Sequence, residues 1–85
     1  MPKSQFTSAY ASFVRVLVAA RKEAGVTQVE LARRLGKPQP FVSSIENGVR
    51  RVDLIEFYAI AKALKLDPEV LFAAVIRRLP KSVDI

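Results

Sequence analysis

The chain has 85 residues, with no cysteine and no histidine, and carries 14 basic against 8 acidic side chains for a formal net charge of +6. This composition excludes disulfides, zinc–thiolate sites and the usual histidine general base. We therefore expect no enzyme, no metal and no cofactor. The positive charge favours a polyanionic partner. No stretch is apolar over the ~20 residues of a membrane span, so we expect a cytoplasmic protein.

Helix-start and helix-stop signals predict two helices in the first part of the chain. Apolar residues at helical spacing predict a helix from Thr7 or Ser8 to Ala24, which Gly25 ends. Thr27 with Glu30 has the spacing of a capping box and predicts a second, short helix. Gly36 would end it.

Three more helices are predicted after Gly36. The third begins around residues 37–40, since proline is tolerated only in a first turn, and ends at Asn47-Gly48, both of which readily adopt positive φ. Asp53 and Glu56 have capping-box spacing and open a fourth helix through Leu64. Asp67-Pro68 opens a fifth, which runs to about Leu79. With no strand-like alternation, residues 1–85 are predicted to form one all-α domain of five helices.

The excess positive charge lies in the middle of the sequence. Residues 15–51 contain eight basic and three acidic side chains, whereas residues 52–85 contain five of each. Clustered basic residues are typical of nucleic-acid binding, although they also occur on ordinary solvated surfaces. The middle of the chain is therefore the predicted binding region.

Residues 27–48 have the pattern of a helix-turn-helix. Two short helices flank Gly36, and the small Ala32 lies four residues before it, where two steeply crossing helices need little side-chain volume. The residues predicted to face inward are Leu31, Leu35, Val42 and Ile45. The outward face of the second helix then presents Gln39, Phe41, Ser43 and Ser44.

These motifs resemble the phage repressor and Cro-like (Xre-type) helix-turn-helix regulators. The matching pieces, spread over about residues 13–72, are Arg21-Lys22, Gly25-Val26-Thr27-Gln28, Glu30-Leu31-Ala32, Leu35-Gly36, Gln39, Val42-Ser43, Ile45-Glu46-Asn47-Gly48, Leu54 and Ala61-Lys62-Ala63-Leu64. The resemblance implies a five-helix lambda-repressor-like DNA-binding domain. It also implies a recognition helix in the major groove of double-stranded DNA and a homodimer on a two-fold symmetric operator.

The resemblance also implies roles for particular side chains. Gln28 would bind a backbone phosphate and brace Gln39, which would reach a base edge. Arg21 and Glu46 correspond to a partly buried structural ion pair. The full set implied to lie at the DNA is Gln28, Lys37, Gln39, Pro40, Phe41, Ser43, Ser44, Asn47, Arg50 and Arg51.

Several of these positions depart from the family pattern. Lys37 occupies a turn position that is usually apolar, and Pro38 offers no side-chain acceptor where a capping Ser or Thr is common. Pro40 has no donor, and Ser44 is shorter than the usual Arg or Gln. Phe41 either contacts thymine methyls or folds back into the core. Sequence preference would then depend more on DNA shape and on Phe41.

The first and fifth predicted helices are more apolar than a single small core requires. We expect the fifth, at about residues 68–79, to form the homodimer interface, either alone or together with the first, because exposed apolar patches usually mark contacts. Its interface residues would be Phe72, Val75, Ile76 and Leu79. Alternatively, the N-terminal segment and the C-terminal tail cover these faces. A different function is also open, an antitoxin-like or adaptor protein whose apolar faces bind a second protein.

Overall fold

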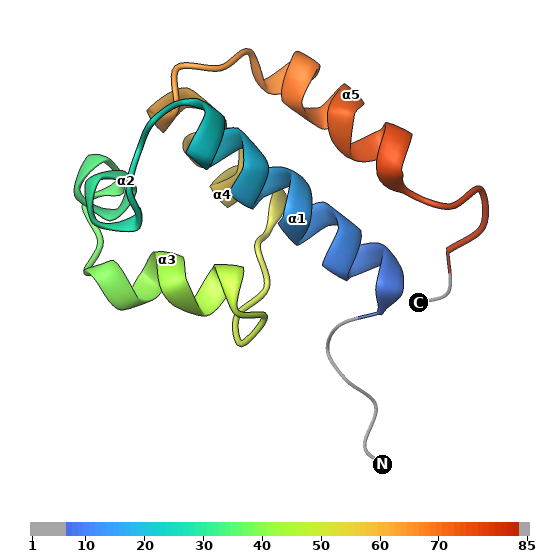
Figure 1. The fold of residues 1–85 in the computed structure, drawn as a ribbon, viewed down its shortest axis with the longest axis horizontal. Helices are drawn as coiled ribbons and strands as arrows, with labels where there is room; N and C mark the ends of the chain where they lie inside the picture. Colours follow the sequence, from blue (N-terminus) through green and yellow to red (C-terminus); the bar gives the residue numbers. More distant parts are fainter. Residues whose placement is uncertain (1–6, 84–85) are drawn as a thin grey trace.

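The computed structural model describes residues 7–83, which form five helices and no strand (Figure 1). This confirms the predicted all-α fold. The helices are α1 (Ser8–Glu23), α2 (Gln28–Leu35), α3 (Gln39–Glu46), α4 (Leu54–Ala63) and α5 (Pro68–Arg78).

Side-chain caps begin four of the five helices. Thr7, Thr27, Asp53 and Asp67 each accept a hydrogen bond from a backbone N–H of the following first turn. The predicted capping box at Asp53 is complete, because the Glu56 carboxylate also accepts from the Asp53 N–H at 3.1 Å.

The capping box predicted at Thr27 is only half formed. Thr27 Oγ1 accepts from the Glu30 N–H at 3.0 Å, but the Glu30 carboxylate does not return to the Thr27 backbone. It binds the guanidinium groups of Arg33 and Arg34 instead. Two charged partners on the same helix face therefore outcompete one neutral N–H for this carboxylate.

Two helix ends have backbone conformations that the sequence signals did not specify. At the end of α3, Asn47 stays near the right-handed region with φ −90°, and Gly48 alone takes positive φ. After α4, Lys65 adopts φ 62° where the sequence has no glycine. The Leu66 N–H donates to the Ala61 carbonyl at 2.9 Å and the Lys65 N–H to that of Lys62 at 3.0 Å. This Schellman pattern offsets the cost of a left-handed lysine.

The core lies where the five helices meet. α2 packs against α3 and α4, while α1 packs against α3 and against α5, which runs beside it along one side of the molecule (Figure 1). Ala32 and Ala61 are almost completely buried, as close helix packing requires. A row of aromatic rings, Tyr10, Phe13, Phe57 and Phe72, connects α1 through α4 to α5 with centroid separations of 5.4 to 5.9 Å.

The outer face of α5 only partly matches the predicted interface. Phe72 and Ile76 are 46% and 53% exposed. Val75 is 2% exposed and belongs to the core cluster, so its assignment to an interface is wrong: it lies about one helical turn after the buried Leu71, on the inner face of α5. Leu79 is half-buried and also packs against the core. The alternative cover by the N-terminal segment concerns residues 1–6, which lie outside the described residues.

None of the helices within residues 7–83 is both long enough and apolar enough to cross a bilayer.

Candidate nucleic-acid interface

Helices α2 and α3 form the predicted helix-turn-helix, with a tight turn at Gly36. Gly36 has φ 69°, in the left-handed region that favours glycine, and the chain then enters α3 through Pro38. Pro38 makes no side-chain cap, as its chemistry dictates, but its carbonyl accepts from the Phe41 N–H at 2.9 Å. Gln39 is thus the first residue of α3 and is exposed.

A chain of hydrogen bonds connects the buried part of α1 to the start of α3. Arg21 donates from Nε to Glu46 Oε2 at 2.7 Å and from Nη2 to Glu46 Oε1 at 3.0 Å. Gln28 Nε2 donates to the same Oε1 at 2.7 Å, and Gln28 Oε1 accepts from Gln39 Nε2 at 3.1 Å. The Gln39 amide is therefore held at a fixed position by Gln28, which is itself held by Glu46.

The ion pair at the base of this chain is largely shielded from water. The side chains of Arg21 and Glu46 are 10% and 9% exposed. A third guanidinium nitrogen, Nη1, donates to the Val26 carbonyl at 2.9 Å. A bidentate, hydrogen-bonded geometry of this kind is what a buried ion pair needs to offset desolvation.

Phe41 occupies a position between the core and the outer surface. It is half-buried and packs against the core cluster, so the core-facing alternative describes most of its side chain. The cations of Lys37 and Arg50 lie 5.5 and 4.7 Å from its ring centroid. Phe41 therefore gathers two basic residues beside α3 through cation–π contacts.

Arg50 is held by an acidic partner that sequence spacing did not reveal. Its Nη1 and Nη2 donate to Glu56 Oε1 and Oε2 at 2.9 and 2.6 Å. The Arg50 guanidinium, followed by the Asp53 backbone N–H, lowers the pKa of Glu56 to about 2. Arg50 thus has a fixed orientation but shares its charge with a carboxylate. No spacing rule relates residues six apart across a loop.

The two serines of α3 both bond to their own helix. Ser43 Oγ donates to the Pro40 carbonyl at 3.3 Å and Ser44 Oγ to the Phe41 carbonyl at 3.1 Å. A hydroxyl whose proton is used in this way has only its acceptor lone pairs left.

The remaining predicted residues lie around the C-terminal end of α3. Asn47 is exposed and caps the helix, where its N–H donates to the Ser43 carbonyl at 2.9 Å. Arg51 places its guanidinium 4.2 Å from the ring centroid of Tyr10 in α1. The structure thus brings together two groups, Gln28 with Gln39, and Lys37 with Phe41 and Arg50, and directs Arg51 toward α1.

Comparison with known proteins identifies the family. A helix-turn-helix family model matches residues 17–71. The chain belongs to the Xre-type helix-turn-helix family. Among solved structures, this Xre-type domain is similar to an XRE-family-like protein from Pseudomonas syringae pv. tomato, with 42% identity and a TM-score of 0.78 over 86% of this chain and 89% of that chain.

Two further relatives extend the comparison. The restriction-modification controller protein C.Esp1396I, solved as a tetramer with its natural 35 base-pair operator, is 25% identical with a TM-score of 0.77 over 86% of this chain and 96% of that chain. An uncharacterised HTH-type transcriptional regulator of Mycobacterium tuberculosis is 38% identical over 61 residues. That match covers 72% of this chain and 41% of the relative, so the matched region is less than half of that protein.

Removal of the Glu46 carboxylate is expected to destabilise the domain strongly. The Glu46→Ala variant leaves the buried Arg21 guanidinium without its counter-charge, at a cost of about 3–5 kcal/mol in the free energy of unfolding. The double variant Arg21→Met/Glu46→Leu removes both charges and should recover most of that loss. Urea denaturation of the two proteins measures the difference, and equal stabilities would contradict a buried pair.

Protonation of Glu56 is expected to weaken the α3–α4 loop at acidic pH. Because its folded pKa of about 2 lies below the ordinary glutamate value of 4.5, the contribution of this carboxylate to stability is complete above pH 4.5 and is lost as the pH falls toward 2. The Glu56→Gln variant should be less stable than the parent at pH 7 and closer to it at pH 2.5. Thermal unfolding at both pH values tests this; a pH-independent difference would contradict it.

Proposed function

We propose that this chain is a sequence-specific DNA-binding transcriptional regulator that acts in the cytoplasm as a homodimer on a two-fold symmetric operator. The observation that carries the proposal is the braced Gln39, held at the exposed start of α3 by Gln28. A base-reading amide needs a fixed orientation to discriminate bases, and glutamine can bond bidentately to adenine. Family membership and the operator-bound neighbour support the proposal.

In this proposal α3 enters the major groove with its N-terminal end toward the bases. Gln39 reads a base edge, with the exposed Pro40 next to it and the half-buried Ser43 one turn further along α3. The serine hydroxyls accept hydrogen bonds, from a base amine or from water, rather than donate them. With few long polar side chains on α3, DNA shape contributes a large share of the preference.

Phosphate contacts in the proposal come from the residues that flank α3. Lys37 precedes the helix and Arg50 follows it, and both lie against Phe41, so their charges keep a fixed spacing. Gln28, Asn47 and Arg51 complete the set as backbone contacts, whereas the Ser44 hydroxyl already donates to the Phe41 carbonyl and has no proton left for a phosphate oxygen. Such contacts set the register of the protein on the duplex without reading sequence.

The proposed homodimer uses the exposed part of α5. Phe72 and Ile76 are large apolar side chains one helical turn apart that remain about half exposed in the single chain, with Leu79 at the edge. A two-fold interface through this patch would place the two α3 helices on half-sites about 34 Å apart.

The two classes of DNA contact are separable by mutation. Gln39→Ala should reduce the ratio of affinities for a selected operator and for random duplex, each mismatch in such a site being worth about 1–3 kcal/mol. Arg50→Ala should weaken binding to both duplexes about equally and reduce the salt slope by about one unit. Electrophoretic shifts over a range of salt concentrations measure both quantities.

The control for this experiment is Arg77→Ala, which removes one positive charge from an exposed position on α5 rather than beside α3. An unchanged salt slope for Arg50→Ala would mean that Arg50 pairs with Glu56 but contacts no phosphate. Absence of binding to any duplex at low salt would overturn the proposed function.

The oligomeric state depends on a surface that polar substitution can disrupt. Ile76→Glu should convert a dimer into a monomer in analytical ultracentrifugation, because burial of a carboxylate without a partner is costly. The control Arg77→Glu places the same charge at the neighbouring position and should remain dimeric. A parent chain that is monomeric at high concentration would contradict the homodimer.

A second candidate function is that of an adaptor or antitoxin-like protein, and one observation favours it. α4 leaves Leu54, Ile55 and Tyr58 more than half exposed, an apolar surface outside the α5 patch. Exposed apolar patches of this kind mark protein contacts. A homodimer that buries α5 while α4 remains accessible would leave room for such a partner.

A further inference from the structure

A groove between α1 and α5 is not used by either proposed surface. It has a volume of about 780 Å³, within the range of small-molecule and peptide sites. α5 borders it with Val70, Leu71 and Ala74, whereas Phe72 and Ile76 lie on the opposite flank of that helix. The helix-turn-helix contributes no residue to its lining. The groove is therefore separate from the proposed DNA and dimer surfaces.

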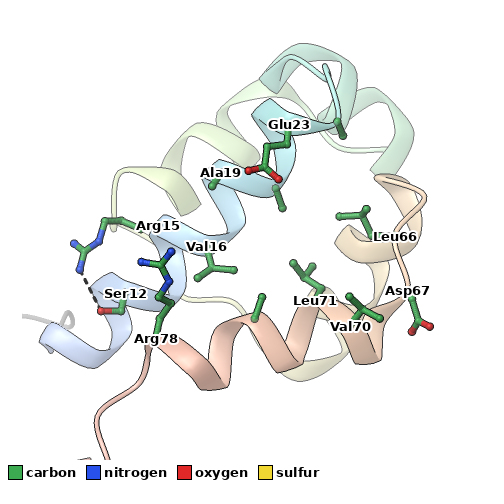
Figure 2. Close-up of a pocket in the computed structure, with 13 residues that line it drawn as sticks. Ser12, Arg15, Val16, Ala19, Glu23, Leu66, Asp67, Val70, Leu71 and Arg78 are labelled. Atoms are coloured by element: carbon green, nitrogen blue, oxygen red, sulfur yellow. Dashed lines mark hydrogen bonds between the residues drawn. The ribbon is translucent and has the colours of Figure 1, made fainter.

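The floor of this groove is made of small and aliphatic side chains. Val16 and Ala19 of α1 lie across from Leu71 of α5 (Figure 2), and Ala20 and Ala74 complete this part of the lining. Three of these five side chains are single methyl groups, which leave room for a backbone to approach closely. Val70 on the rim is 64% exposed, so apolar surface continues out of the groove.

The two ends of the groove carry opposite charges. Arg15 and Arg78 come from α1 and α5 at one end, where Arg78 extends toward α1 (Figure 2). Ser12 lies beside them, and its Oγ accepts from Arg15 Nη2 at 3.1 Å. At the other end Glu23 is the last residue of α1, while Asp67, whose carboxylate caps α5 by accepting from the Glu69 N–H, points away from Glu23 (Figure 2). A ligand that matches this groove has a negative group at one end, a positive group at the other and an apolar middle.

The separation of these charges sets the length of the ligand. Arg15 and Glu23 are eight residues apart on α1, and Asp67 and Arg78 are eleven apart along α5, which corresponds to about 12 and 16 Å at 1.5 Å per helical residue. An extended peptide covers about 3.3–3.6 Å per residue. Four or five residues therefore span the distance from the basic to the acidic end.

We propose that the α1–α5 groove binds a short extended peptide of four or five small apolar residues with free termini. Its carboxylate lies between Arg15 and Arg78, a geometry suited to charge-assisted hydrogen bonds from guanidinium groups. Its terminal ammonium lies at the Glu23 carboxylate. Its side chains rest on the alanine and valine floor. The peptide is thus a candidate effector, recognised by both of its termini.

Isothermal titration calorimetry of the full chain with the pentapeptides Ala-Val-Leu-Val-Ala and Ala-Ala-Leu-Ala-Ala tests this proposal. At least one should bind with a dissociation constant of about 1 mM or tighter, equivalent to about −4 kcal/mol. Amidation of the C-terminus or acetylation of the N-terminus should each weaken binding about three- to fivefold, as expected for solvent-accessible ion pairs.

Variants of the protein assign the binding to the groove. Arg78→Glu should weaken binding of the unmodified peptide about as much as amidation of its C-terminus does. The adjacent Arg77→Glu, at a position outside the groove lining, should leave the affinity unchanged. Ala19→Trp should block binding by filling the floor. Amide chemical shifts of the labelled parent should move along α1 and α5. These variants leave α3 and the Phe72–Ile76 patch intact, so their outcome does not depend on DNA binding.

Three results would overturn the proposal. They are no binding of either pentapeptide up to about 5 mM, equal affinity for free and doubly blocked peptides, and chemical-shift changes confined to α3, α4 or the outer face of α5. Equal affinity for blocked peptides would instead indicate a groove for a segment within a longer protein chain.

Discussion

The buried ion pair between Arg21 and Glu46 is the interaction on which the arrangement of the helices depends. Its two side chains come from α1 and from the last residue of α3, and Glu46 also receives the amide of Gln28 from the start of α2. Three helices therefore meet on one carboxylate. A charge this shielded from water is tolerated only with its partner in place, so any relative shift of α1 and α3 is penalised by an unpaired charge. Within residues 7–83, no buried side-chain nitrogen or oxygen lacks a partner.

The count of 14 basic side chains overstates the number of unpaired positive groups near α3. Arg21 is paired with Glu46, Arg50 with Glu56, and both Arg33 and Arg34 with Glu30. Arg34 Nη1 also donates to the Ala63 carbonyl at the end of α4, at 2.8 Å, which makes it a link between α2 and α4. Much of the basic cluster in the middle of the sequence is thus structural. The carboxylates of Glu30, Glu46 and Glu56 orient these guanidinium groups.

Local signals in the sequence predicted the helices well, because each one begins or ends at a residue whose side chain or backbone determines the boundary. Asp53, Asp67 and Gly36 act through their immediate neighbours, which a sequence displays directly. Prediction failed where a competing partner decided the outcome. The Glu30 carboxylate binds two arginines instead of the Thr27 backbone. Val75 lies four residues after Leu71 on the buried face of α5, not on the outer face that Phe72 and Ile76 share.

The candidate site was predictable only as a set of residue types. The Gln28–Gln39 contact followed from the resemblance, and the structure adds that Glu46 joins the ion pair to it. The Arg50–Glu56 pair and the position of Arg50 on Phe41 depend on how the loop from Asn47 to Asp53 folds back on α3. The Val49 and Arg50 N–H groups both donate to the Ser44 carbonyl, a local closure that no short motif encodes.

The row of aromatic rings from Tyr10 to Phe72 has a mechanical consequence. Tyr10 accepts from the Val52 N–H at 2.9 Å and lies under Arg51, while the far end of the row is the proposed dimer residue Phe72. Packed rings deform little, so the row acts as a rigid strut between the subunit contact and the loop behind α3. In the proposed homodimer the distance between the two α3 helices is then fixed by the protein. One extra base pair at the centre of the operator would shift and rotate one half-site relative to the other. A dimer with rigidly connected α3 helices could not adjust to that change.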